Sequence, residues 1–117
     1  MKGAFLVIAR NKAKWVRYAA QAMLAQTHSP LEIVFSDQGS TDGTREILDE
    51  CMRSYNGPNK VRLIDCPHLE AKGMVGCNTH LDWAHSQIDA DVIMMQSADD
   101  RAHPERAART MEIYEEF

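Results

Sequence analysis

Two polar turns carry the side chains of this 117-residue chain that are best suited to chemistry. The first turn, residues 36–44, reads SDQGSTDGT and places Asp37 directly after an apolar run. A carboxylate at the end of a buried strand can accept hydrogen bonds from a ribose or from the edge of a base. The same residues also suit a structural turn, in which Asp42 or Thr41 caps the next helix and Gly39 supplies a positive φ. Both interpretations stay open at this point.

The second turn, residues 96–101, reads QSADDR. Asp99 and Asp100 are adjacent carboxylates, and their oxygens suit a hard divalent ion such as Mg²⁺ or Mn²⁺ that bridges to phosphate. An acidic turn that brings Asp100 near the N-terminus of a following helix would also be stabilised by the helix dipole. The pair of aspartates alone does not separate a metal site from a structural turn.

The elements that must position these turns are visible as an alternation of apolar runs and helical periods. Strands are expected at 4–8, 31–35, 61–64 and 91–95, and helices at 14–26, 43–53, 74–86 and from Pro104 onward. The order β-α-β-α-β-α-β-α predicts an α/β, Rossmann-like fold with a mostly parallel sheet flanked by helices. Ligands bind such sheets beyond the carboxyl ends of the strands, which selects residues 9–11, 36–42, 67–73 and 97–103 as candidate site segments.

Composition narrows the class of partner. With 44% hydrophobic and 26% charged residues, the chain is typical of one ordinary soluble domain. Thirteen Lys and Arg against seventeen Asp and Glu give a net charge of −4, and the scattered cations argue against nucleic acid as a partner. No apolar run approaches the length of about 18 residues that a membrane span needs.

Cysteine and histidine spacing argues against a zinc site. The three cysteines, Cys51, Cys66 and Cys77, form no C-x-x-C pair and are expected to be reduced thiols of a cytoplasmic protein. His80 and His85 lie five residues apart, so they would not share one helix face as zinc ligands at i, i+4 do.

Taken in order, the motifs resemble those of the family 2 glycosyltransferases of the GT-A fold. The matches are Gln26-Thr27 at a helix end, DQGSTDGT at 37–44 with glutamine in place of the family's second aspartate, Gly73 with Asn78, Asp99-Asp100, and Pro104. They extend over essentially the whole chain. The resemblance implies that residues 1–117 form a single nucleotide-sugar-binding region, the amino-terminal half of that fold. A fragment of a longer domain is expected, because the last helical pattern has no glycine stop.

The resemblance also implies roles for individual residues. Asp37 would accept hydrogen bonds from the base of a UDP- or GDP-sugar, and Ala9, Arg10 and Asn11 would line the same pocket. The segment Ser97-Ala98-Asp99 corresponds to the family's Asp-x-Asp motif, so that Asp99, with Asp100, would hold Mn²⁺ or Mg²⁺ at the diphosphate.

Two departures from the family pattern affect the phosphate end of the site. Ser97 stands where the family has the first carboxylate of the metal motif. Cys77 stands where the family often has an arginine before Asn78, and Lys72 is a candidate replacement for that charge.

The implied activity is transfer of a sugar from a nucleotide-diphosphate sugar to an unknown acceptor, with inversion and with a metal that stabilises the departing diphosphate. The family takes its catalytic base from the other half of the fold, so no residue of this chain is assigned as that base. The alternative is a non-catalytic binding or assembly module of the same fold, for which Ser97 and Cys77 would be signs of decay. A dinucleotide-dependent oxidoreductase is a weaker option, because residues 9–12, ARNK, lack the Gly-x-Gly-x-x-Gly pattern.

Overall fold

The computed structural model describes residues 1–70 and 72–116. Strands and helices alternate along them in the expected order: β1 (Gly3–Ala9), α1 (Val16–Leu24), β2 (Glu32–Asp37), α2 (Thr44–Arg53), β3 (Lys60–Asp65), α3 (Gly73–Ser86), β4 (Val92–Ser97) and α4 (Arg106–Glu115). The α/β class is confirmed, and the element ends lie within two residues of the expected ones.

The strands form one parallel sheet in the order β3-β2-β1-β4. In the register of β1, Val7 pairs with Phe35 of β2 on one side and with Gln96 of β4 on the other. The chain therefore builds outward from β1 through β2 and β3, and then crosses to the opposite side to add β4. The switch point lies between the carboxyl ends of β1 and β4, which is where open α/β sheets bind ligands.

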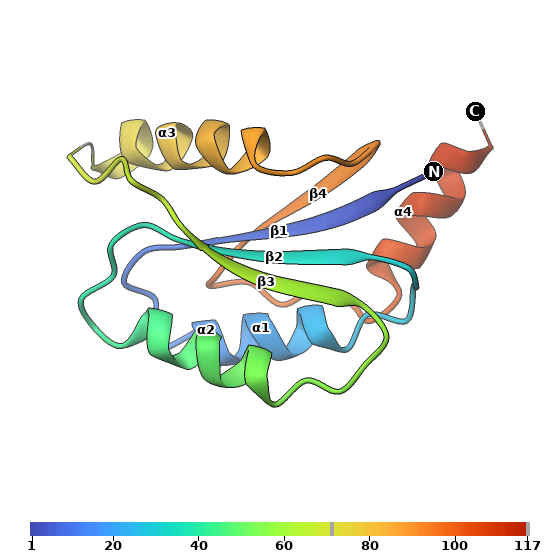
Figure 1. The fold of residues 1–117 in the computed structure, drawn as a ribbon, viewed down its shortest axis with the longest axis horizontal. Coiled ribbons are helices and arrows are strands. Elements are labelled where there is room, and N and C mark those ends of the chain that lie inside the picture. Colours follow the sequence, from blue (N-terminus) through green and yellow to red (C-terminus); the bar gives the residue numbers. More distant parts are fainter. Residues whose placement is uncertain (71, 117) are drawn as a thin grey trace.

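Helices cover both faces of the sheet, with α1 and α2 on one face and α3 on the other (Figure 1). Strand side chains alternate between the faces, so Phe5 and Ile33 pack with α1, α2 and α4, whereas Leu6 and Val34 pack with Ala84 of α3. Every residue of β1 is buried, which explains its unbroken apolar sequence. In the described part of the chain, no helix is long and apolar enough to cross a membrane.

Helix α3 packs on the sheet through a face that its sequence pattern does not predict. Gly76, His80 and Ala84, spaced four residues apart, are its buried residues, whereas Val75 and Asn78 are exposed. Small side chains at the first and third positions let the helix approach closely, and the His80 ring bonds to Ser36 of β2 at 2.7 Å. The buried positions of α3 are therefore small or polar, whereas its larger apolar Leu81 and Trp83 pack against the sheet only partly buried.

The end of α1 is tied to the start of α4 by Gln26, the first residue of the Gln-Thr pair. Its amide nitrogen donates to the His103 carbonyl at 2.9 Å, and its amide oxygen accepts from the Ala107 N–H at 2.9 Å. Pro104, expected in the first turn of the last helix, instead lies in a turn before it, because the Arg106 N–H already bonds back to the His103 carbonyl.

Candidate functional site

Asp37 ends β2 and is nearly fully buried. Its carboxylate accepts hydrogen bonds from the Ser40 N–H at 3.0 Å and from Ser40 Oγ at 2.5 Å. Gly39 between them has φ +61°, the positive value expected for a glycine in this turn. The Asp37 side chain therefore organises the turn itself, a role that the sequence did not predict.

Asp42 plays a similar part at the head of α2. One carboxylate oxygen accepts from the Thr44 N–H at 3.1 Å and from Thr44 Oγ1 at 2.5 Å, and the other accepts from the Ala13 N–H at 3.1 Å. Burial favours a higher pKa for the Asp42 carboxyl, but the hydrogen bonds from Thr44 and Ala13 outweigh it and lower the pKa. Asp42 thus satisfies N–H groups in two segments of the chain.

The turn after β1 is fastened to the turn after β2 by further bonds. Asn11, at φ +51°, donates its N–H to Ser40 Oγ at 2.9 Å and accepts from the Thr41 N–H at 2.8 Å. The Lys12 N–H donates to Thr44 Oγ1 at 2.8 Å. Two connections from different β-α units are therefore held as one surface at the edge of the sheet.

A cleft of about 330 Å³ opens between these turns and the first half of α3. Its lining residues come from the ends of β1 and β4, from the turns that follow β1 and β2, and from α3: Ile8, Ala9, Arg10, Lys12, Gln38, Gly73, Cys77, His80 and Ser97. The cleft lies at the topological switch point of the sheet. Two cationic side chains and the start of a helix give it a surface suited to an anion.

The predicted nucleotide-binding residues are distributed unevenly around this cleft. Ala9, Arg10 and Ser97 line it, and Asn11 fixes the turn beside it. Ala98 is fully buried, and its N–H bonds to the Ile8 carbonyl at 3.0 Å.

Asn78 of α3 and Lys72, the residue just before that helix, stand apart from the cleft. Both are exposed, and neither is among its lining residues. Their neighbours Gly73 and Cys77 line it instead, so α3 turns the residues next to the predicted ones toward the cleft.

Gln38 shapes one wall of the cleft and was not predicted as a site residue. It is nearly fully buried, and its amide nitrogen donates to the carbonyls of His68 at 2.8 Å and of Gly76 at 3.1 Å. Its amide oxygen accepts from the Arg10 guanidinium at 3.4 Å. An aspartate, which the family has here, is acceptor-only when ionised and cannot make the two donations. The exchange of aspartate for glutamine was the available signal of this role.

His80 lies at the floor of the cleft and is neutral. Burial, and secondarily the Arg10 charge, lower the pKa of His80 to about 4. Its Nε2 pairs with Ser36 Oγ at 2.7 Å, which satisfies the serine at the end of β2. The histidine is thus part of the core.

The acidic turn after β4 is closed by its own backbone and by Gln96. The Asp100 N–H donates to the Ser97 carbonyl at 3.2 Å, and the Gln96 amide donates to the Asp100 carbonyl at 2.8 Å. Because α4 begins only at Arg106, Asp100 lies outside its first turn, so the helix-dipole explanation for this aspartate does not hold.

The Asp99 carboxyl faces a hydroxyl and an ammonium group. A hydrogen bond from the Ser97 side chain lowers the pKa of Asp99, burial opposes the shift, and the charge of Lys12 adds to the lowering. Lys12 Nζ lies 3.6 Å from Asp99 Oδ2. Lys12 was missed from the sequence, although it directly follows the candidate segment 9–11, because only the fold brings it to β4.

The carboxylates at this turn fit a divalent ion only in part. Asp99 and Asp100 line one depression together with Trp15, Tyr18 and Arg101, and both are exposed. Over residues 1–70 and 72–116, no group of three or more acidic, histidine or cysteine side chains gathers to hold a metal. A hard cation with six or more oxygen ligands would therefore take most of them from phosphate and water.

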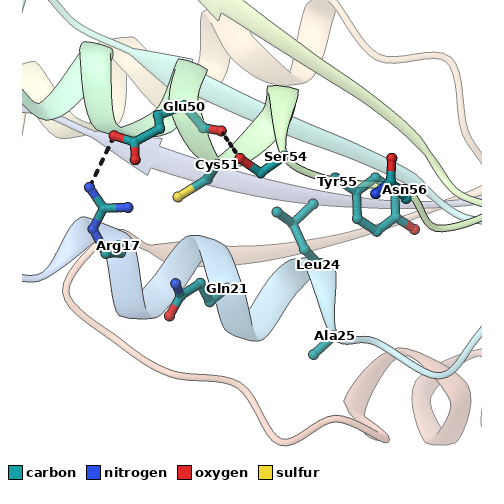
Figure 2. A pocket seen from close by; sticks show the side chains of 9 residues that line it. All are labelled: Arg17, Gln21, Leu24, Ala25, Glu50, Cys51, Ser54, Tyr55 and Asn56. Atoms are coloured by element: carbon teal, nitrogen blue, oxygen red, sulfur yellow. Dashed lines mark hydrogen bonds and ion pairs between the residues drawn. The ribbon is translucent and has the colours of Figure 1, made fainter.

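A second hollow, of about 340 Å³, lies between α1 and α2 and is shown in Figure 2. Arg17 and Glu50 pair across it at 3.2 Å, and burial raises the pKa of the neighbouring Cys51 thiol. A thiol of raised pKa is a poor nucleophile. None of the turns at the carboxyl ends of the strands contributes to this hollow, so it is not the candidate site.

Comparison with known proteins identifies the protein family to which this chain belongs. Residues 4–116 match the family described as glycosyl transferase family 2. The chain therefore belongs to the family 2 glycosyltransferases, as its motifs indicated.

Relatives and solved structures agree with this assignment. An uncharacterized glycosyltransferase of Nostoc sp. strain PCC 7120 is 29% identical over 98% of this chain and 33% of its own length. The UDP complex of Staphylococcus aureus TarS 1–349 superimposes with a TM-score of 0.76 at 19% identity, over 99% of this chain and 32% of that one. The mannosyltransferase PcManGT of Pyrobaculum calidifontis, in complex with GDP-Man and Mn²⁺, gives 0.69 at 18% identity, over 86% and 28%. The chain thus spans about a third of the length of these proteins.

Proposed function

We propose that this chain forms the donor-binding part of a glycosyltransferase that moves a sugar from a UDP- or GDP-sugar to an acceptor, with inversion and with the help of a divalent metal. The observation that carries the proposal is the cleft at the β1–β4 switch point, lined by Arg10, Lys12 and Ser97 and adjoined by Asp99. Cationic side chains at such a cleft suit a nucleoside diphosphate. Structural neighbours that hold UDP, UDP-GlcNAc or GDP-Man support both donor classes.

The base is assigned to the fastened turns after β1 and β2. Ala9, Arg10 and Asn11 form one side, and Asp37 lies at the other. Ser40 already donates twice to the Asp37 carboxylate, one bond to each oxygen. Each oxygen of a carboxylate has two acceptor sites, so Asp37 keeps the capacity to accept from a base N–H.

The diphosphate is assigned to the part of the cleft between Lys12 and the start of α3. Asp99, assisted by Asp100, would hold Mn²⁺ or Mg²⁺ there, and Ser97 would orient Asp99 through its hydrogen bond. When bound, the ion would lower the charge of the leaving nucleoside diphosphate. Lys72 and Asn78 are proposed to reach the donor only from the outer rim, because both are exposed outside the cleft.

The acceptor hydroxyl and the catalytic base are assigned to no residue of this chain. In an inverting displacement the hydroxyl attacks the anomeric carbon as a carboxylate takes its proton and the diphosphate leaves. That base is proposed to lie in the part of the fold that this chain does not span. The reaction is placed in the cytoplasm, where free thiols such as Cys51, Cys66 and Cys77 stay reduced.

Calorimetric titration of the intact protein with UDP- and GDP-sugars, with and without Mn²⁺, tests this function. One donor class is expected to bind in a metal-dependent way, and Asp99→Asn is expected to remove that dependence. Asp89→Asn is the matched control, because Asp89 is an exposed aspartate between α3 and β4, away from the cleft. Absence of binding by every nucleotide and sugar nucleotide would refute the proposal and favour a non-catalytic module of the same fold.

A further inference from the structure

The ammonium group of Lys12 lies beside Asp99, the carboxylate assigned above to a divalent cation. Its Nζ lies 3.6 Å from Asp99 Oδ2, and the two side chains are 38% and 42% exposed. The backbone of Lys12 is fixed by the Thr44 side chain at the head of α2. Lys12 also lines the cleft assigned above to the donor. One flexible, positively charged side chain thus lies within reach of both the metal-motif carboxylate and the proposed diphosphate position.

We propose that the ammonium group of Lys12 competes with the divalent metal for Asp99 in the free protein. When metal and donor bind together, this ammonium group moves from Asp99 to the donor diphosphate. The inference rests on the proposed function, which supplies the diphosphate. It assigns Lys12 as the residue that couples metal binding to donor binding.

Electrostatics gives the direction of this coupling. A divalent ion that binds Asp99 without nucleotide must displace the ammonium group and then remain beside its positive charge. A diphosphate changes the balance, because its negative oxygens can accept from Lys12 and ligate the ion at the same time. Metal and nucleotide should therefore each strengthen the binding of the other, and by the same factor.

The geometry supports an exchangeable contact rather than a fixed one. At 3.6 Å, with both partners well exposed, the Lys12–Asp99 pair belongs to the weak class of ion pairs. The lysine stem has four rotatable carbons, so Nζ can move within the cleft without displacement of the backbone.

The first test measures Mn²⁺ binding to the intact protein without any nucleotide, by electron paramagnetic resonance at low salt. Lys12→Met is expected to tighten Mn²⁺ binding about five- to tenfold, since it removes both the competitor and a nearby positive charge. Lys12→Arg should restore the weak binding of the wild type. Lys2→Met is the matched control: it removes the same charge from an exposed lysine just before β1, at the opposite end of the sheet from Asp99. Its effect should stay within about twofold.

Two outcomes of the Mn²⁺ test overturn the inference. Equal Mn²⁺ affinity of Lys12→Met and Lys2→Met would show that the ammonium of Lys12 does not compete for the site. A gain in Lys12→Met that persists in the Lys12→Met, Asp99→Asn double variant would show that the competition is not at Asp99.

The second test measures UDP and GDP affinity without metal. Lys12→Met is expected to weaken binding of the favoured nucleotide several-fold, and unchanged affinity would refute the transfer of Lys12 to the diphosphate. The two arms separate this inference from the proposed function. If the wild type binds sugar nucleotides and Lys12→Met does not alter Mn²⁺ affinity, the inference fails alone. If no nucleotide binds, the proposed function and the transfer step fail together, whereas the Mn²⁺ arm still reports competition at Asp99.

Discussion

Between pH 7.5 and pH 5 this protein should lose stability through one buried histidine, and replacing that residue should remove this loss. His80 is 2% exposed, and its ring is bonded to Ser36 Oγ at 2.7 Å. Burial is the main reason that its pKa is lowered from 6.5 to about 4, and the Arg10 charge adds to the shift. The folded protein therefore holds a neutral ring at pH values where an unfolded chain has already bound a proton.

The sign and size of the effect follow from proton linkage. Because the folded pKa is lower than the unfolded one, the unfolded state binds more protons between about pH 4 and pH 6.5. The free energy of unfolding should be unaffected by His80 above this window and should fall as pH falls through it. A pKa difference of about 2.5 corresponds to about 3 kcal/mol when fully developed, and to about 2 kcal/mol at pH 5.

The assay is urea unfolding at pH 7.5 and pH 5.0 for the wild type and for His80→Asn, which cannot titrate. The variant is expected to lose about 2 kcal/mol less than the wild type between the two pH values, whatever its stability at pH 7.5. His85→Asn, an exposed histidine on the same helix, should lose as much as the wild type. Equal losses for His80→Asn and the wild type would refute the reasoning. A proton NMR titration of the His80 ring provides a direct check, with a midpoint near pH 4 expected.

Two further predictions concern the wall of the cleft and the first turn. Gln38→Glu should lower the free energy of unfolding by about 2–4 kcal/mol, since a carboxylate cannot donate to the two carbonyls that the amide holds. Urea unfolding measures this change, and a Gln38→Glu variant as stable as the wild type would contradict the hydrogen-bond assignment. Gly39→Ala should lower the free energy of unfolding by about 1–2 kcal/mol, because φ at Gly39 is +61° and an added Cβ would lie 2.9 Å from Leu69 Cδ2. A thermal unfolding midpoint equal to that of the wild type would contradict this prediction and show that the turn relaxes freely.

The fold could be predicted from the sequence because the patterns that specify its strands and helices are local. Buried parallel strands require nearly continuous apolar runs, and Ala4 to Ala9 is such a run. The alternation of these runs with helical periods leaves few topologies, and the observed sheet is one of them. Element ends were less exact, as at Pro104, because the turn before α4 depends on a hydrogen bond between residues three apart.

The sequence predicted site residues only where they directly follow the ends of strands. Ala9, Arg10 and Ser97 lie in the segments selected in this way, and they line the cleft. The positions on α3 could not be predicted in this way, because its buried residues are small or polar. Its Leu81 and Trp83 are only partly buried against the sheet, and its apolar Met74 and Val75 are exposed, so periodicity does not reveal which side meets the sheet. The roles of Gln38 and Lys12 depend on partners 30 and 87 residues away along the chain, which no local pattern specifies.

The bonds between the turns after β1 and β2 bear on the cost of ligand binding. Asn11 and Lys12 are held by Ser40, Thr41 and Thr44 through hydrogen bonds within the chain itself. Loops that are ordered only by a ligand lose conformational entropy during binding, whereas loops fastened to each other lose it during folding. A molecule that enters this side of the cleft meets a surface already in place, so its affinity depends on the contacts it makes and on the charges it meets rather than on the ordering of the protein.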